Sequence, residues 1–111
     1  MLVSNIENAK EYYNNLFNWN ISYHPTNNKT LMVETKNLHF FIKEVKLYRD
    51  FFALQHYSFE VEDISEIIMI LDQNNIKYEK GKFSSFKFNN YTWVEWRDPD
   101  GVRLECIEKR G

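Results

Sequence analysis

The chain has 111 residues and a formal net charge of −2, and apolar residues make up 43% of it and aromatic residues 17%. This length suffices for one domain, 1–111, and leaves little room for a second. The charge balance, without a run of basic residues, argues against nucleic acid or an anionic membrane as the partner. Its single cysteine, Cys106, excludes an internal disulfide. With no signal-like segment, we expect a cytoplasmic protein.

The first half of the chain predicts one helix followed by three strands. Asn5 is placed to cap the helix, which should end near Asn18-Trp19. Its apolar residues recur at helical spacing at Ile6, Ala9, Tyr13, Leu16 and Phe17. Alternating segments after it predict strands at Asn20–His24, Thr30–Glu34 and Leu38–Glu44.

The segment after these strands lacks Gly, Pro and Ser and carries Tyr48, Phe51 and Phe52, so we expect it to pack rather than act as a flexible linker. A strand that includes His56 follows. Asp63 then begins a second helix with a capping-box-like start and an apolar face of Ile64, Ile67, Ile68 and Leu71. The remaining strands are expected at Ile76–Glu79, Phe83–Phe88, Tyr91–Arg97 and Val102–Glu108.

The two halves resemble each other weakly, which indicates a duplicated unit. Val3, Asn5 and Ile6 correspond to Val61, Asp63 and Ile64, and Leu38, Phe40 and Ile42 correspond to Val102, Leu104 and Cys106. We therefore predict an α+β fold of two βαβββ modules, at about 1–45 and 54–109, joined by residues 46–53. A ferredoxin-like sandwich is the main alternative.

Strand alternation assigns the faces of the second module. One face is apolar and should pack under the helix: Tyr57, Phe59, Val61, Val94, Trp96, Val102, Leu104 and Cys106. The opposite face then gathers His56, Ser58, Trp93, Glu95, Arg103 and Glu105. Polar side chains on a concave sheet are costly unless they are paired, hydrated or functional. This face is therefore the candidate site.

Three features together resemble the vicinal oxygen chelate superfamily, which includes glyoxalase I, extradiol dioxygenases, fosfomycin-resistance thiol transferases and bleomycin-resistance proteins. They are His56 near the start of a strand, the hairpin Asp98-Pro99-Asp100-Gly101, and Glu105 four residues after its glycine. The resemblance implies a strongly curved, cup-shaped mixed sheet with helices on the outside. It also implies a divalent metal, such as Zn, Ni, Mn or Fe, for which His56 and Glu105 match ligand positions.

The first module does not complete this ligand set. The position equivalent to His56 would precede residue 1, and Phe41 stands where a carboxylate is expected. His39, two residues earlier on the same strand face, is the candidate third ligand. Since a zinc site needs at least three protein ligands, a bound metal is not the favoured prediction.

Three functions stay open. The favoured one is binding of a small aromatic or cationic molecule, without a catalytic metal, by residues of an aromatic and acidic cleft: Phe41, Ser58, Trp93, Glu95 and Arg103, together with Glu105. The alternative is a metal-dependent lyase, isomerase or thiol transferase of the glyoxalase type that uses His56 and Glu105, with His39 or Glu95 as an additional ligand. The third is a degenerate member that works through its dimer surface. We expect a homodimer, because the short first strand would leave a sheet edge open.

Overall fold

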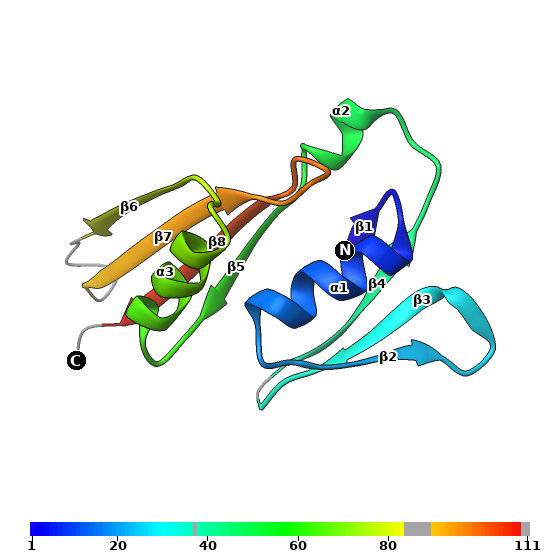
Figure 1. The fold of residues 1–111 in the computed structure, drawn as a ribbon, viewed down its shortest axis with the longest axis horizontal. Coiled ribbons are helices and arrows are strands. Elements are labelled where there is room, and N and C mark those ends of the chain that lie inside the picture. The colour runs from blue at the N-terminus through cyan, green and yellow to red at the C-terminus, as the bar shows by residue number, and fades with distance from the viewer. Residues whose placement is uncertain (37, 84–89, 110–111) are drawn as a thin grey trace. The chain divides into compact units, whose positions relative to one another are not determined.

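The computed structural model describes residues 1–36, 38–83 and 90–109. Its contacts divide the chain into two units, Met1–Phe52 and Ala53–Gly111 (Figure 1). Each unit is a four-stranded mixed sheet with a helix against it, in the chain order βαβββ. The predicted α+β fold of two βαβββ modules is therefore confirmed. The ferredoxin-like alternative, a single sheet, does not describe these two sheets.

The first unit contains β1 (Leu2–Val3), α1 (Ile6–Leu16), β2 (Asn20–His24), β3 (Asn27–Glu34), β4 (His39–Glu44) and α2 (Arg49–Phe52). The strand order is β1-β4-β3-β2. Strand β1 runs parallel to β4, and the other neighbours are antiparallel. The short helix α2 lies in the predicted connection, where Phe52 is buried while Tyr48 is 83% exposed. The expected packing of this segment therefore holds for one of its three aromatic rings and not for Tyr48.

The second unit repeats the pattern with β5 (His56–Glu60), α3 (Ile64–Gln73), β6 (Tyr78–Phe83), β7 (Tyr91–Arg97) and β8 (Arg103–Lys109). The strand order is β5-β8-β7-β6, and β5 is parallel to β8. The other neighbours are antiparallel. The two sheets thus have the same connectivity.

Some element boundaries differ from the prediction. Helix α1 ends at Leu16, because Phe17 turns to an extended backbone while its N–H still bonds to the Tyr13 carbonyl. Strand β6 begins at Tyr78 and continues through Gly81 to Phe83, where the sequence predicted one strand ending at Glu79 and another starting at Phe83. Residues 84–88 of that second predicted strand lie outside the described residues.

The helices of the two units begin in the same way. Asn5 Oδ1 accepts a bond from the N–H of Asn8 at 2.9 Å, and Asp63 Oδ1 accepts one from the N–H of Ser65 at 2.9 Å. A glutamate from the last strand of each sheet also reaches its helix. Glu44 accepts from Ile6 N–H at 3.0 Å, and Glu108 accepts from Ile64 N–H at 2.9 Å. A carboxylate at a helix N-terminus satisfies an orphan donor and meets the positive end of the dipole, so both units use one design.

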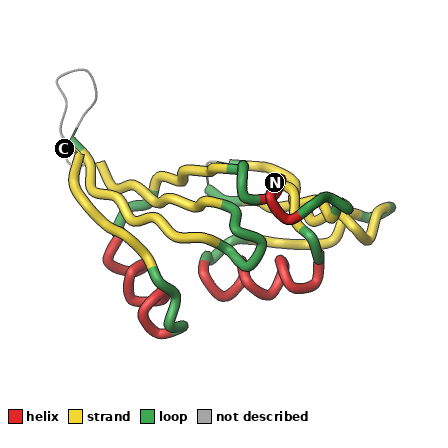
Figure 2. The backbone as a smooth tube through the Cα atoms, turned by 90° about the horizontal axis from the view of Figure 1, so that it is seen from above, coloured by secondary structure: helices red, strands yellow, loops and turns green. Residues whose placement is uncertain are grey.

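In each unit the helix covers one face of the sheet (Figure 2). Side chains of the helix and of the sheet and loops that pack with it are fully buried: Val3, Ile6, Tyr13, Leu31, Val33 and Ile42 in the first unit, and Leu71, Val94, Val102, Leu104 and Cys106 in the second. Burial raises the pKa of the Cys106 thiol to about 12, so this cysteine is a small apolar core residue. The predicted apolar strand face is thus confirmed where Leu104 and Cys106 lie.

Part of the aromatic content packs around the end of α1. The ring centroids of Phe17 and Trp19 are 4.1 Å apart and nearly parallel. Tyr13 stacks on Trp19 at 5.9 Å, and Phe40 meets Trp19 edge-on at 5.4 Å. These rings stabilise the turn from α1 into β2. The excess of aromatic residues is therefore partly structural, which leaves fewer rings for a ligand site than the composition suggested.

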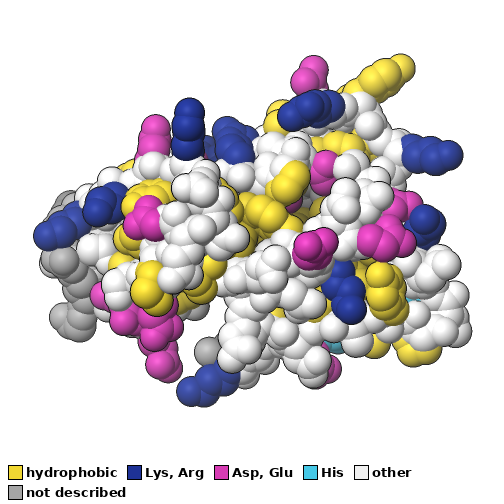
Figure 3. Space-filling view, in the orientation of Figure 1, with side chains coloured by type: hydrophobic (Ala, Val, Ile, Leu, Met, Phe, Trp, Pro, Cys, Tyr) yellow, Lys and Arg dark blue, Asp and Glu magenta, His cyan; other side chains and the backbone are white. Residues whose placement is uncertain are grey.

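Charged side chains of both signs are interspersed on the face shown in Figure 3. Such mixing is typical of a solvated protein surface, and the described residues drawn in this view form no extended basic patch for a nucleic acid. Among the described residues, no helix has the length and apolar character needed to cross a membrane.

Candidate functional site

The candidate residues lie on the face of the second sheet that is turned away from α3, which we call the polar face. Strand register places them in three adjacent rows that run across β5, β8 and β7. Two of these rows continue onto β6. The rows are His56-Arg103-Arg97, Ser58-Glu105-Glu95-Glu79 and Glu60-Ile107-Trp93-Gly81. Because neighbours in a row and in the next row are within reach of long side chains, these groups act on one another.

Arg103 and Glu95 form the strongest interaction on this face. Arg103 Nη2 donates to Glu95 Oε2 at 2.9 Å, and Arg103 Nε donates to Glu95 Oε1. The hydrogen bonds from Arg103 lower the pKa of Glu95, and the charges of Arg103, His56 and Arg97 act in the same direction. Two parallel bonds between guanidinium and carboxylate hold both groups in one geometry. The pair therefore carries almost no net charge toward a ligand.

Glu105 is held differently, although it lies directly opposite Glu95 in the register. Its Oε1 accepts a hydrogen bond of 2.8 Å from the hydroxyl of Ser58. Within the described part of the chain it makes no ion pair. Like charges directly opposite each other in a sheet repel, so the neutralisation of Glu95 by Arg103 allows the two carboxylates to coexist. Glu105 is therefore the central carboxylate that is bonded to an uncharged hydroxyl, while the bonds of Arg103 go to Glu95.

The other arginine of the face supports the hairpin instead. Arg97 Nη1 donates to the carbonyls of Gly101 at 2.9 Å and Ala53 at 3.3 Å. Asp98 Oδ1 accepts from the N–H groups of Asp100 and Val102, each at 2.9 Å, and Gly101 has φ of +86°. The Asp98 to Gly101 turn is therefore structural, as predicted.

Trp93 lies across the neighbouring strand β6 at Gly81. A Cβ atom placed on Gly81 would stand 2.7 Å from Cζ2 of the Trp93 indole and 2.9 Å from Cε2. The bare backbone of Gly81 thus admits the indole ring close against the sheet. The sequence reading missed this residue, although a glycine inside a strand is a recognised sign of a close approach. The indole of Trp93 forms a flat aromatic surface beside Glu95, which we call the aromatic floor.

Phe41 and His39, the candidate residues of the first unit, share one strand face of β4. Phe41 is 40% exposed, and its ring lies 5.4 Å from the ring of His39 and 6.4 Å from that of His24. His24 ends β2, as the predicted strand Asn20–His24 does, and its Nδ1 accepts from the N–H of Thr26 at 3.2 Å. The roles of Phe41 and His39 in ligand or metal binding stay predictions.

The donor set around His56 and Glu105 does not fit a divalent metal. In residues 1–36, 38–83 and 90–109, no group of three or more His, Cys, Asp or Glu side chains is arranged to hold an ion. The residue directly opposite His56 in the register is Arg103, which is not a metal ligand. A divalent ion between His56 and Glu105 would therefore have too few donors.

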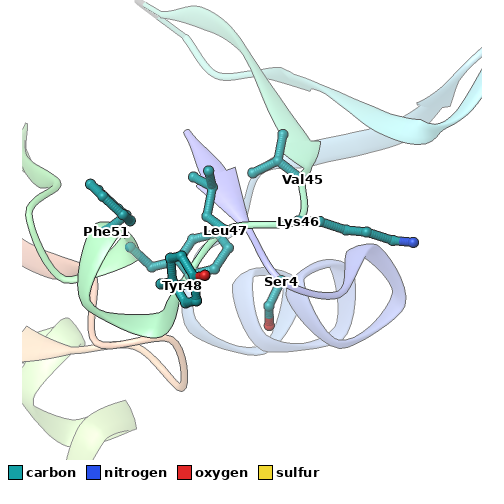
Figure 4. A pocket seen from close by; sticks show the side chains of 7 residues that line it. Ser4, Val45, Lys46, Leu47, Tyr48 and Phe51 are labelled. Carbon is teal, nitrogen blue, oxygen red and sulfur yellow. The ribbon is translucent and has the colours of Figure 1, made fainter.

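A separate hollow of about 700 Å³ lies in the first unit, near the connection (Figure 4). It is lined by Ser4, Val45, Lys46, Leu47, Tyr48, Phe51 and Phe52. Apart from Ser4 and Lys46 these lining residues are apolar or aromatic, and none of them carries a carboxylate or imidazole, so the hollow lacks the chemistry of the polar face. Exposed Leu47, Tyr48 and Phe51 are the residue types that protein interfaces bury. We therefore place the candidate ligand site on the polar face and not in this hollow.

Comparisons with known proteins agree on the fold. No protein-family model matches the sequence, and no curated protein matches it significantly. A solved structure from the mobile metagenome of V. pseudocholerae is similar over 100% of this chain and 91% of its own, at 14% identity and a TM-score of 0.79. The glyoxylase/bleomycin resistance protein/dioxygenase domain from Frankia sp. is similar over 98% and 92%, at 16% identity and a TM-score of 0.73.

A variant of the fosfomycin resistance protein FosX from Listeria monocytogenes, in complex with Mn(II) and a dihydroxypropylphosphonic acid, is similar over 99% of this chain and 88% of its own. The identity is 12% and the TM-score 0.71. Identities this low carry information about architecture and not about chemistry. Together with the two βαβββ modules, these similarities show that the chain has the vicinal oxygen chelate fold.

Proposed function

We propose that the polar face binds a small, flat, positively charged molecule. Glu105 is the counter-ion of the ligand, and the indole of Trp93 is the surface on which its ring stacks. The observation that carries the proposal is the difference between the two central carboxylates. Glu95 is neutralised by Arg103, whereas Glu105 is bonded to the uncharged hydroxyl of Ser58.

The geometry suits a ligand whose charge and ring are close together. Trp93 is the neighbour of Glu95 two residues along β7, on the same face, and Glu95 is opposite Glu105. The backbones of diagonal neighbours of this kind are roughly 7–8 Å apart, and the indole extends from Trp93 over Gly81, so the ligand needs a ring system of at least two rings to reach from the indole to Glu105. Stacking of a cation on an indole contributes about 0.5–1 kcal/mol at an exposed site and more when desolvated. Ser58 holds the Glu105 carboxylate in place.

Binding of matched probes tests the proposal. We expect N-methylquinolinium to bind, and naphthalenesulfonate and naphthalenemethanol, which offer a similar ring with negative or no charge, to bind more weakly. Calorimetry or chemical-shift titration measures the affinities. Glu105→Gln and Trp93→Ala should each weaken N-methylquinolinium by roughly five-fold, the equivalent of about 1 kcal/mol.

Glu60→Gln is the matched control, because Glu60 lies on the same face in the next row and is paired at 3.6 Å with Lys109. It should leave the affinity unchanged within about two-fold, since exposed ion pairs contribute little. Equal affinity for the three probes, or equal loss in Glu60→Gln and Glu105→Gln, would refute the proposal.

A chelator decides between this proposal and a metal-dependent enzyme of the glyoxalase type. The similarity to a Mn(II)-bound FosX variant is the observation that keeps the enzyme in view. We expect affinity for N-methylquinolinium to be the same with and without EDTA. The enzyme would be favoured instead if protein purified without a histidine tag contained stoichiometric metal, and if both His56→Ala and Glu105→Gln abolished that metal content.

A further inference from the structure

Arg103 has two carboxylates within reach and uses one of them. It lies opposite His56 on one side and Arg97 on the other, and neither side chain is acidic. Glu105 is two residues further along β8 on the same face, a separation of roughly 6.6 Å along the strand, which an extended arginine spans. Its Nε and Nη2 atoms nevertheless both donate to Glu95 on the neighbouring strand.

We infer that Glu95 determines the charge preference of the polar face by holding Arg103 away from Glu105. This inference rests on the proposed function and names the residue on which its preference for cations depends. Glu95 is a positioning residue, because it acts on the ligand through Arg103 and Glu105. Its own charge is cancelled by the pair and contributes little to the ligand.

Removal of the Glu95 charge changes the partner of Arg103. Glu79 is the third carboxylate of the row and lies on β6, opposite Glu95 in the register. It is therefore two strands away from Arg103, at roughly 9.6 Å between strand axes. Glu105 is nearer. Arg97 cannot compete for Glu105 while it bonds to the carbonyls of Gly101 and Ala53. In a Glu95→Gln protein, Arg103 therefore turns to Glu105 and neutralises the carboxylate that the cation needs.

A double-mutant cycle separates this role from a structural one. We expect Glu95→Gln to weaken N-methylquinolinium by roughly five-fold or more, as much as Glu105→Gln does, and to strengthen naphthalenesulfonate. Arg103→Gln should retain or strengthen binding of the cation, because it leaves two carboxylates. Glu95→Gln combined with Arg103→Gln should return the cation affinity to within about two-fold of the original protein, since Glu105 is again unpaired.

Rescue by the second substitution is the decisive result, because a variant that had only lost structure would not recover binding when a further polar residue was removed. Urea unfolding of each variant checks that all are folded. A crystal structure of the ligand-free Glu95→Gln protein gives an independent readout, in which the Arg103 guanidinium should contact Glu105.

The outcomes distinguish the two proposals. If the original protein binds neither N-methylquinolinium nor naphthalenesulfonate, the proposed function fails. If it binds N-methylquinolinium and requires Glu105, but Glu95→Gln binds equally well or the double variant is not rescued, the inference about Glu95 fails alone. Arg103 remaining beside residue 95 in the Glu95→Gln crystal structure would also overturn it.

Discussion

Replacing Gly81 by alanine should displace the aromatic floor of the polar face without unfolding the protein. The new Cβ would stand 2.7 Å from Trp93 Cζ2, whereas ordinary contact begins at 3.4 Å. The indole must therefore move by about 0.7 Å, the difference between these distances. A gap of this size forfeits a quarter to a half of each dispersion contact, or about 0.5–1 kcal/mol for a ring that packs on one face.

The unfolded chain changes in the opposite direction. Gly81 lies in an antiparallel ladder opposite Trp93, and its φ is not positive, so alanine can adopt the same backbone. Such a substitution restricts the unfolded state and stabilises a protein by about 0.4–1 kcal/mol. The two effects nearly cancel, and we expect the free energy of unfolding to change by less than about 1 kcal/mol.

Urea unfolding and fluorine NMR of fluorotryptophan-labelled protein measure these two effects separately. Of the three tryptophans, Trp93 should show the largest resonance shift, and affinity for N-methylquinolinium should fall several-fold. Gly101→Ala is the contrasting control. Its φ of +86° is unfavourable for alanine, so it should cost about 1–2 kcal/mol and leave the Trp93 resonance in place. A loss above about 2 kcal/mol for Gly81→Ala, or an unmoved Trp93 resonance, would refute the reasoning.

Three further predictions concern the core, the ion pair and the exposed apolar residues. Leu104→Asp should unfold the second unit, because Leu104 is fully buried and an unpaired charge there costs several kcal/mol. Glu105→Gln should melt like the original protein when both variants are followed by circular dichroism. An equal loss of thermal stability in the two variants would mean that the strand faces are reversed. The pKa of Glu95 is lowered in the folded state, so its pairing with Arg103 stabilises the fold above the ordinary glutamate pKa and is lost as pH falls through the lowered value. The stability gap between the original protein and the Glu95→Gln, Arg103→Gln variant should accordingly narrow on acidification, and a gap independent of pH would contradict the pairing. We propose a homodimer that forms through Leu47, Tyr48 and Phe51. Tyr48→Lys should therefore shift the sedimentation coefficient toward that of the monomer, whereas Met69→Lys, at another exposed apolar position, should not. A monomeric original protein would exclude this interface.

The parts of the structure that follow from local periodicity could be predicted from the sequence. Asn5 and Asp63 cap helices because a short polar side chain before an amphipathic run satisfies the first free N–H groups. Leu104 and Glu105 point to opposite faces because side chains alternate along a strand, whatever the rest of the fold does. These inferences need only the spacing of residues within one element.

Interactions between strands were harder to predict, because register decides which of several equivalent partners meet. The sequence offers Glu79, Glu95 and Glu105 to two arginines, and nothing in the spacing says that Arg97 bonds to carbonyls of the hairpin. Gly81 likewise gains its role only when β6 is placed beside Trp93. A single residue of register slip would put different side chains opposite each other.

This dependence on register changes how the candidate site is interpreted. The sequence presented Glu95 and Glu105 as one acidic pair, which predicted a cleft with two charges for a cation. The pairing of Glu95 with Arg103 divides that pair into a neutralised carboxylate and a charged one. An ion pair on a sheet surface contributes little to stability by itself. Its larger consequence here is electrostatic, because the pair directs the Arg103 guanidinium toward Glu95 on the neighbouring strand and not toward Glu105 on its own strand.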